Sequence, residues 1–119
     1  MTFQSTEFPT IRHWWHDVAE TLAPIHQSIK QSSVGLTQSE IQERLDQIHE
    51  AYSIAHQVDM PIDIKAQMIA TLCNLMMSFS ARYEGQKRDS AKLHRITQVE
   101  WVLLQEMLQR EGIDYTVLQ

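Results

Sequence analysis

Six histidines in a chain of 119 residues raise the question of a metal site. His13, His16 and Glu20 stand three or four positions apart, so on a helix they share one face and can reach a common ion. This face lies opposite the apolar stripe of the same predicted helix, where solvated polar side chains are the usual content. We therefore expect an exposed polar face, and a metal site at these three residues is the alternative hypothesis.

Glu100 is a second candidate for a functional side chain. Apolar residues lie four positions before it and three and four positions after it, so helical periodicity directs its carboxylate toward the core. A buried charge is costly unless it is paired or protonated. In a bundle, His26 and His49 fall within about one helical turn of Glu100 along the axis, which permits a buried site for a cation or small polar ligand. The other interpretation places Glu100 at a border between helices, where it reaches water or Arg82.

The sequence contains no catalytic motif that these residues could complete. His49 and Glu50 begin like a zinc-protease helix, but the next histidine, His56, comes two turns later, whereas such ligands must be one turn apart. The glycines are all predicted at helix ends, so no phosphate-binding loop can form. We therefore predict a protein that is not an enzyme and carries no cofactor. One further alternative is a catalytic site shared between subunits and built from His13, His16, Asp17 and Glu20.

Composition places the chain among helical globular domains. It is 43% hydrophobic and 21% charged, and its 3 Gly and 3 Pro are too few for a disordered chain or a turn-rich all-β fold. Cys73 is the single cysteine, which excludes an internal disulfide and favours a reducing compartment, so we expect a cytoplasmic location. The first residues lack a signal-peptide pattern, and the uncharged stretch 66–81 is too short and polar to span a bilayer. We expect one domain over residues 1–119 and no membrane contact.

The charges are divided unevenly along the chain. Residues 1–60 hold 3 basic and 8 acidic residues, residues 61–119 hold 7 of each, and the net charge is −5. Half of the basic residues cluster between positions 82 and 95, but Glu84 and Asp89 stand among them and no aromatic residue alternates with them. This pattern favours an oriented protein partner over nucleic acid.

Helix start and stop signals divide the chain into four predicted helices, at about residues 10–33, 38–58, 61–83 and 90–111. Thr37 and Glu40 form a capping box, which satisfies free backbone N–H groups at a helix start. Pro61 suits a first helical turn, and the glycines suit helix ends. Because the connections are short, consecutive helices should be antiparallel. We therefore predict an all-α, up-down-up-down four-helix bundle.

Two features of this bundle stay open at the level of sequence. Pro24 either bends the first helix or splits it into two. Residues 61–111 could also form one long helix through Gly85, which would need a partner chain to cover it.

The third predicted helix is apolar around most of its circumference. Its polar strip is narrow and consists of Asp63, Gln67, Thr71, Asn74 and Ser78. A single bundle covers roughly half of each helix surface, so we expect this helix to pack against a second copy of the chain. In the fourth predicted helix, Trp101 and Val102 point away from the other apolar residues, which are Leu93, Ile96, Leu103, Leu104, Met107 and Leu108. The predicted interface consists of Ile69, Cys73, Met76, Met77, Trp101 and Val102.

Together these observations predict a small non-catalytic bundle that acts through protein contacts, as an adaptor, chaperone or inhibitor. Its expected partners are a second copy, in a homodimer, and an unidentified protein. The alternative from a different class is a bundle that binds a metal or small ligand through Glu100, His26 and His49. We also expect the apolar residues of the tail 113–119 to dock on the bundle.

Overall fold

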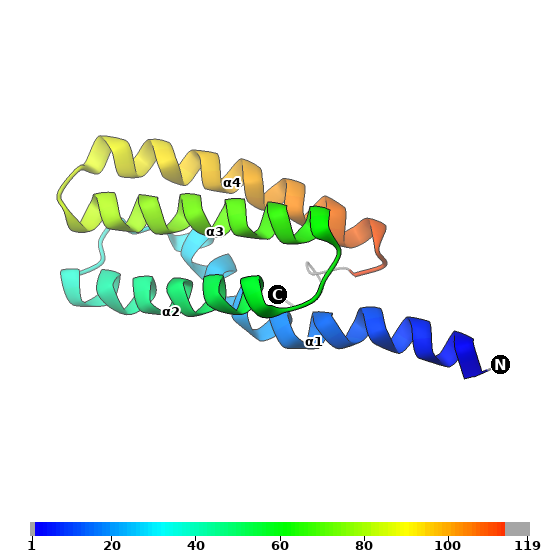
Figure 1. Ribbon diagram of the computed structural model, residues 1–119. Coiled ribbons are helices and arrows are strands. Elements are labelled where there is room, and N and C mark those ends of the chain that lie inside the picture. The colour runs from blue at the N-terminus through cyan, green and yellow to red at the C-terminus, as the bar shows by residue number, and fades with distance from the viewer. Residues whose placement is uncertain (1, 114–119) are drawn as a thin grey trace.

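Four helices make up the part of the chain that the computed structural model describes, residues 2–113. They are α1 (Thr2–Gln31), α2 (Gln38–Gln57), α3 (Ile62–Tyr83) and α4 (Lys87–Arg110), and no strand occurs within residues 2–113. Side chains are described over this range except at 2–13, 21 and 24. The all-α class is confirmed, and the helices pack as a bundle (Figure 1). Within the described residues, no helix combines the length and hydropathy that crossing a membrane requires.

The start of α2 has the cap that the sequence predicts. The backbone N–H of Glu40 donates to Thr37 Oγ1 over 3.2 Å, and the N–H of Thr37 donates to Glu40 Oε1 over 3.0 Å. These bonds satisfy two N–H groups that would otherwise have no partner. The backbone hydrogen bond is also the main reason why the pKa of the Glu40 carboxyl is lowered. The predicted capping box is confirmed.

A tight turn at residues 84–86 separates α3 from α4. Gly85 has a φ of +80°, which a residue with a side chain rarely adopts. The single long helix through Gly85 is therefore excluded. α4 begins at Lys87, about one turn before the predicted start. Ser90 therefore lies inside the helix, and its hydroxyl is 3.3 Å from the Ser33 hydroxyl.

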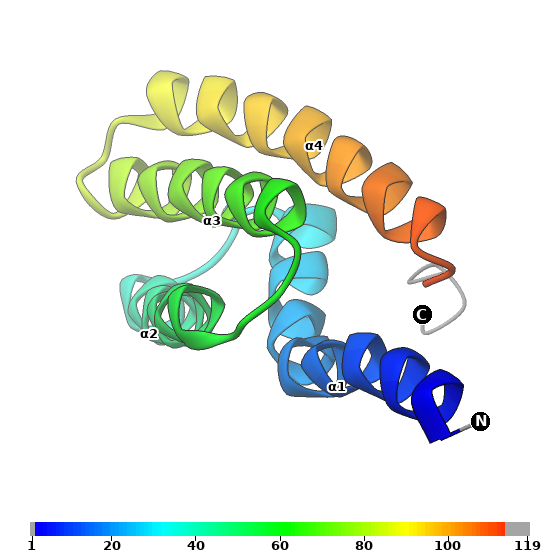
Figure 2. The same ribbon diagram turned by 45° about the vertical axis from the view of Figure 1, so that its right-hand side comes forward.

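α3 lies between α2 and α4 and packs along both (Figures 1 and 2). α3 turns back along α2, and α4 turns back along α3. α1 packs mainly on α2, and its second half also reaches α3 and α4. α1 is bent but is one continuous helix through position 24, so Pro24 does not split it. This agrees with the physics of an interior proline, which removes one backbone hydrogen bond and bends a helix.

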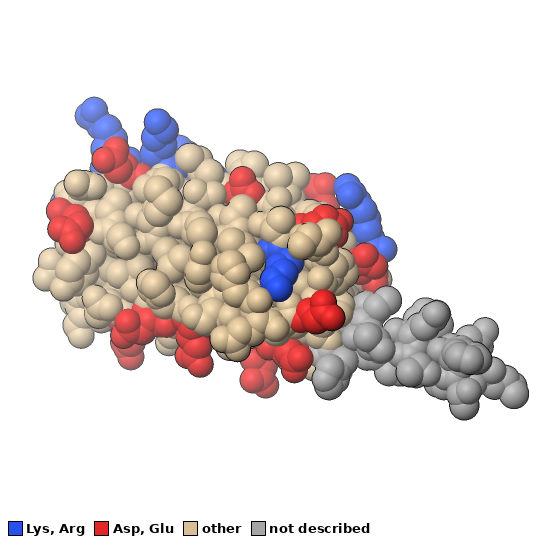
Figure 3. Space-filling model, in the orientation of Figure 1, with Lys and Arg blue, Asp and Glu red and all other residues tan. Residues whose placement is uncertain are grey.

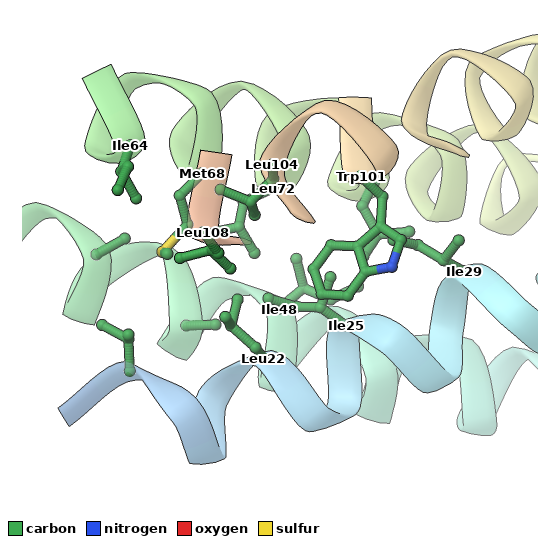
Figure 4. Close-up of a cluster of buried hydrophobic side chains, with 14 of the residues drawn as sticks. Leu22, Ile25, Ile29, Ile48, Ile64, Met68, Leu72, Trp101, Leu104 and Leu108 are labelled. Carbon is green, nitrogen blue, oxygen red and sulfur yellow. The ribbon is translucent and has the colours of Figure 1, made fainter. Parts of the chain in front are cut away.

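The core draws apolar side chains from all four helices (Figure 4). Complete burial of one such side chain stabilises the fold by about 1.5–3 kcal/mol, so these contacts are the main source of stability. On α3 the residues that face the core stand three or four positions apart, at helical spacing, and each is at most 1% exposed: Ile64, Met68, Leu72, Leu75 and Phe79.

Small polar side chains line the contact between α3 and α4. Thr71 and Ser78, two members of the polar strip of α3, are buried there. Ser78 Oγ donates to the backbone carbonyl of Ser90 over 3.0 Å, and buried Thr97 donates to the Leu93 carbonyl over 2.8 Å. Hydroxyl side chains satisfied by backbone carbonyls can be buried without penalty. The polar strip of α3 therefore faces α4, and apolar surface on the side away from the core is turned outward instead.

Candidate functional site: the α3–α4 outer face

Apolar side chains remain uncovered on the sides of α3 and α4 that face away from the core. On α3, Ile62 is 80% exposed and Met77 is 53% exposed. On α4, Ile96 and Leu103 are 40% and 44% exposed. Positions three or four residues apart share one side of a helix, so these residues belong to continuous stripes. The α3–α4 outer face is the surface formed by Ile62, Ala66, Ile69, Cys73, Met77, Ile96 and Leu103.

An open groove of about 580 Å³ runs between the two stripes, near the turn that joins α3 to α4. Met77 of α3 and Leu93 and Ile96 of α4 supply its apolar lining, and Glu84 and Lys92 supply charged side chains. A concave apolar surface with few polar groups suits an inserted apolar side chain from a partner.

Most charged side chains on this side of the molecule lie along its borders, although one Lys or Arg side chain lies nearer the middle (Figure 3). Exposed apolar side chains with charged residues around them are typical of a protein contact site. The acidic edge, on α2, consists of the exposed residues Glu40, Glu43, Asp46 and Glu50. The basic edge, on the first half of α4, consists of the exposed residues Lys87, Arg88, Lys92 and Arg95, with Asp89 among them.

The predicted interface residues differ in their exposure. Met77 and Val102 are exposed, whereas Ile69, Cys73 and Met76 are half-buried at the side of α3. The segment 66–81 is therefore not fully enclosed by the other described helices.

Cys73 also contacts α2. The Cys73 thiol raises the pKa of the Tyr52 hydroxyl. The main cause is repulsion between the two negative charges when both groups are ionised, and a hydrogen bond between the side chains adds to it. This contact ties one border of the α3–α4 outer face to α2.

Trp101 is buried, which corrects its predicted place at an interface. It is 4% exposed, and its ring centroid lies 5.6 Å from that of His26. The indole lies between α4 and the side chains of Ile25 and Ile29 on α1 (Figure 4). The prediction was wrong because the buried stripe of α4 includes two hydroxyl residues, which a search for apolar periodicity does not select. That stripe is Ser90, Thr97, Trp101, Leu104 and Leu108.

Glu100, His26 and His49 do not form one metal-holding group. Glu100 is half-buried at the border of α3 and α4, where the Gln67 amide donates to both its carboxylate and its backbone carbonyl. His26 packs on Trp101, and His49 is exposed on α2. Among the side chains that are described, no three His, Cys, Asp or Glu residues are placed to hold a metal ion. The placement of Glu100 matches the border interpretation, with Gln67 as its partner.

The first metal candidate lies partly outside the described side chains. His16, Asp17 and Glu20 are exposed on α1, as expected for a solvated polar face. The side chain of His13 belongs to the range that is not described, so a site that includes His13 is outside the described residues. The tail 114–119 also lies outside the described residues. Ile113 is described, and its side chain packs partly buried against the core.

His94 is a half-buried titratable residue of α4 that the sequence analysis did not identify. Burial lowers its pKa, although a hydrogen bond between its ring and the Ile29 backbone carbonyl opposes this effect. The buried Nδ1 atom of His94 has no hydrogen-bond partner among the described residues. His94 stands two helical turns before Trp101, so the correct stripe of α4 would have identified it.

No protein family, curated protein or solved structure compared with this chain matches it.

Proposed function

We propose that the protein is a non-catalytic four-helix bundle, antiparallel in an up-down-up-down order, that acts through contacts with other proteins. It forms a homodimer through the α3–α4 outer face. The observation that carries this proposal is the exposure of Met77 and Ile96 on the two sides of one open groove. Association that removes these exposed apolar side chains from water is favourable in free energy.

The same arrangement favours a role as an adaptor, assembly chaperone or inhibitor. Pairing through the α3–α4 outer face leaves the exposed side of α1 that carries His16, Asp17 and Glu20 open to a further protein. The two acidic residues on this side would favour a partner with a basic surface. A cytoplasmic location is part of the proposal, and the half-buried thiol of Cys73 agrees with a reducing compartment.

Sedimentation equilibrium tests the homodimer. We expect the unmodified chain to be dimeric at about 10–100 µM, in the range of weak specific complexes. Met77→Glu should raise the dimer dissociation constant by at least about tenfold, because it places a charge at the centre of a desolvated contact.

Val34→Glu is the matched control. Val34 is an apolar residue with 67% exposure, but it lies in the connection between α1 and α2 and outside the α3–α4 outer face. This variant should dimerise like the unmodified chain. A monomeric unmodified chain throughout the concentration range, or equal effects of the two substitutions, would overturn the proposal.

The ligand-binding alternative keeps one testable element, the half-buried Glu100 with its Gln67 partner. It requires stoichiometric metal or a saturable small ligand that Glu100→Gln removes while the fold is kept. Elemental analysis of the purified protein is the direct measurement, and a metal content well below one ion per chain rejects the metal version.

A further inference from the structure

We infer that the two copies of the homodimer pack with their α3 helices parallel, so that the acidic edge of each copy meets the basic edge of the other. This inference rests on the proposed function and adds the orientation of the partner. The occupant of the α3–α4 outer face is then a second copy of this chain, selected by complementary charges at its rim.

Both charged edges lie at the same end of α3. Near the start of α2, Gln38 Nε2 donates to the Tyr83 backbone carbonyl over 3.3 Å. Near the start of α4, Ser90 accepts the hydrogen bond from Ser78 over 3.0 Å. The acidic edge and the basic edge therefore flank the C-terminal half of α3 from its two sides, at the same height along the bundle (Figures 1 and 3).

A twofold axis that runs along α3 exchanges the two sides of the face and keeps its two ends in place. α2 of one copy then lies over α4 of the other, and the acidic edge faces the basic edge at both rims of the dimer. Opposite charges at the rim of an interface raise the association rate and select the matching register.

A twofold axis that runs across α3 exchanges the ends instead. The acidic edge then faces the second half of the partner's α2, where residues 51–60 contain Asp59 and no lysine or arginine. Lys65 of α3 lies beside this half of α2, with its Nζ atom bound to the Val58 carbonyl. The basic edge faces the second half of α4, where exposed Glu106 and Arg110 offer one charge of each sign. Neither rim then brings a cluster of acidic residues against a cluster of basic ones, so the charges favour the axis along α3.

Disulfide cross-linking reads this orientation directly. When the two α3 helices are parallel, each position on the outward stripe faces the same position of the partner. When they are antiparallel, at most one position lies on the twofold axis and faces its own counterpart. We use Ala66→Cys and Met77→Cys, which are exposed and lie about 16 Å apart along one side of α3. Each is made in a Cys73→Ala background, and Val34→Cys in the same background is the control outside the face.

With a mild oxidant and dilute protein, we expect both α3 variants to cross-link to themselves, with Val34→Cys staying uncross-linked. Cross-linking of one α3 position alone, or of neither while Cys73→Ala remains dimeric, would overturn the parallel arrangement. If both the Cys73→Ala chain and the unmodified chain are monomeric, the proposed homodimer itself is wrong. The two failures are therefore distinguishable.

A charge exchange gives an independent measurement. Reversal of the acidic edge by Glu43→Lys with Asp46→Lys should weaken homodimers by at least about tenfold, and so should reversal of the basic edge by Lys92→Glu with Arg95→Glu. An equimolar mixture of the two variants should form heterodimers close to the original affinity, because each reversed edge then meets an opposite charge. If either variant alone dimerises as well as the unmodified chain, the edges do not face each other and the inference fails.

Discussion

Replacement of Trp101 by alanine should cost far more stability than its place in the sequence pattern suggests. The indole is 4% exposed, and a tryptophan of this kind withdraws about 150–250 Å² from water, worth roughly 4–6 kcal/mol at 25 cal/mol per Å². Alanine recovers a small part of that burial, so we expect a loss of about 3–5 kcal/mol. For a domain of this size, the melting temperature should fall by roughly 12–20 °C.

Urea denaturation followed by circular dichroism is the assay, since it does not depend on tryptophan fluorescence. Val102→Ala is the matched control, because this neighbouring residue is 51% exposed and should lose at most about 0.5 kcal/mol. The cost at Trp101 should also be independent of protein concentration, whereas an interface tryptophan would matter less as the dimer dissociates. A loss below about 1 kcal/mol, or one that disappears on dilution, would place Trp101 on the outer surface and refute the argument from burial.

Three further outcomes follow from individual contacts. Thr37→Ala should cost about 1 kcal/mol in urea denaturation, since it leaves the N–H of Glu40 without its cap. Gln67→Ala should cost about 1–2 kcal/mol, and a double-mutant cycle with Glu100→Gln should show coupling, because the amide bonds to a half-buried carboxylate. Since burial lowers the pKa of His94, the unfolded chain binds a proton first as the pH falls through about 6.5, and stability should decline from there toward the lower pKa of the folded state. His94→Gln should make the denaturation midpoint less sensitive to pH between 7.5 and 5.5, and an unchanged slope would contradict this assignment.

The sequence predicted the helices well where backbone chemistry alone decides. Thr37 with Glu40 starts α2, and Gly85 with its positive φ ends α3, because both signals depend on groups within a few residues. The start of α4 was placed too late at Ser90. Ser90 lies within α4, and its hydroxyl is close to that of Ser33, a contact between residues distant in the chain that the sequence does not show.

The sides of the helices were harder to predict than their ends. Apolar periodicity selects residues by type, so it missed Thr97 in the buried stripe of α4 and turned Trp101 outward. Burial of a hydroxyl is decided by whether a carbonyl is within reach, which is a tertiary property. For the same reason the sequence recognised that Glu100 is near the core but did not identify Gln67 as its partner.

The outward apolar stripe of α3 is a consequence of stable packing, as the cost of turning the helix shows. Rotation of α3 to bury Met77 would cover roughly half of one side chain, a gain of about 1 kcal/mol. The same rotation would take Ser78 away from the Ser90 carbonyl, which leaves buried polar groups unpaired at about 1–3 kcal/mol. It would also begin to expose Phe79, which is completely buried and worth about 1.5–3 kcal/mol. The losses exceed the gain, so the described helices keep Met77 outward, and the proposed homodimer would remove this surface from water.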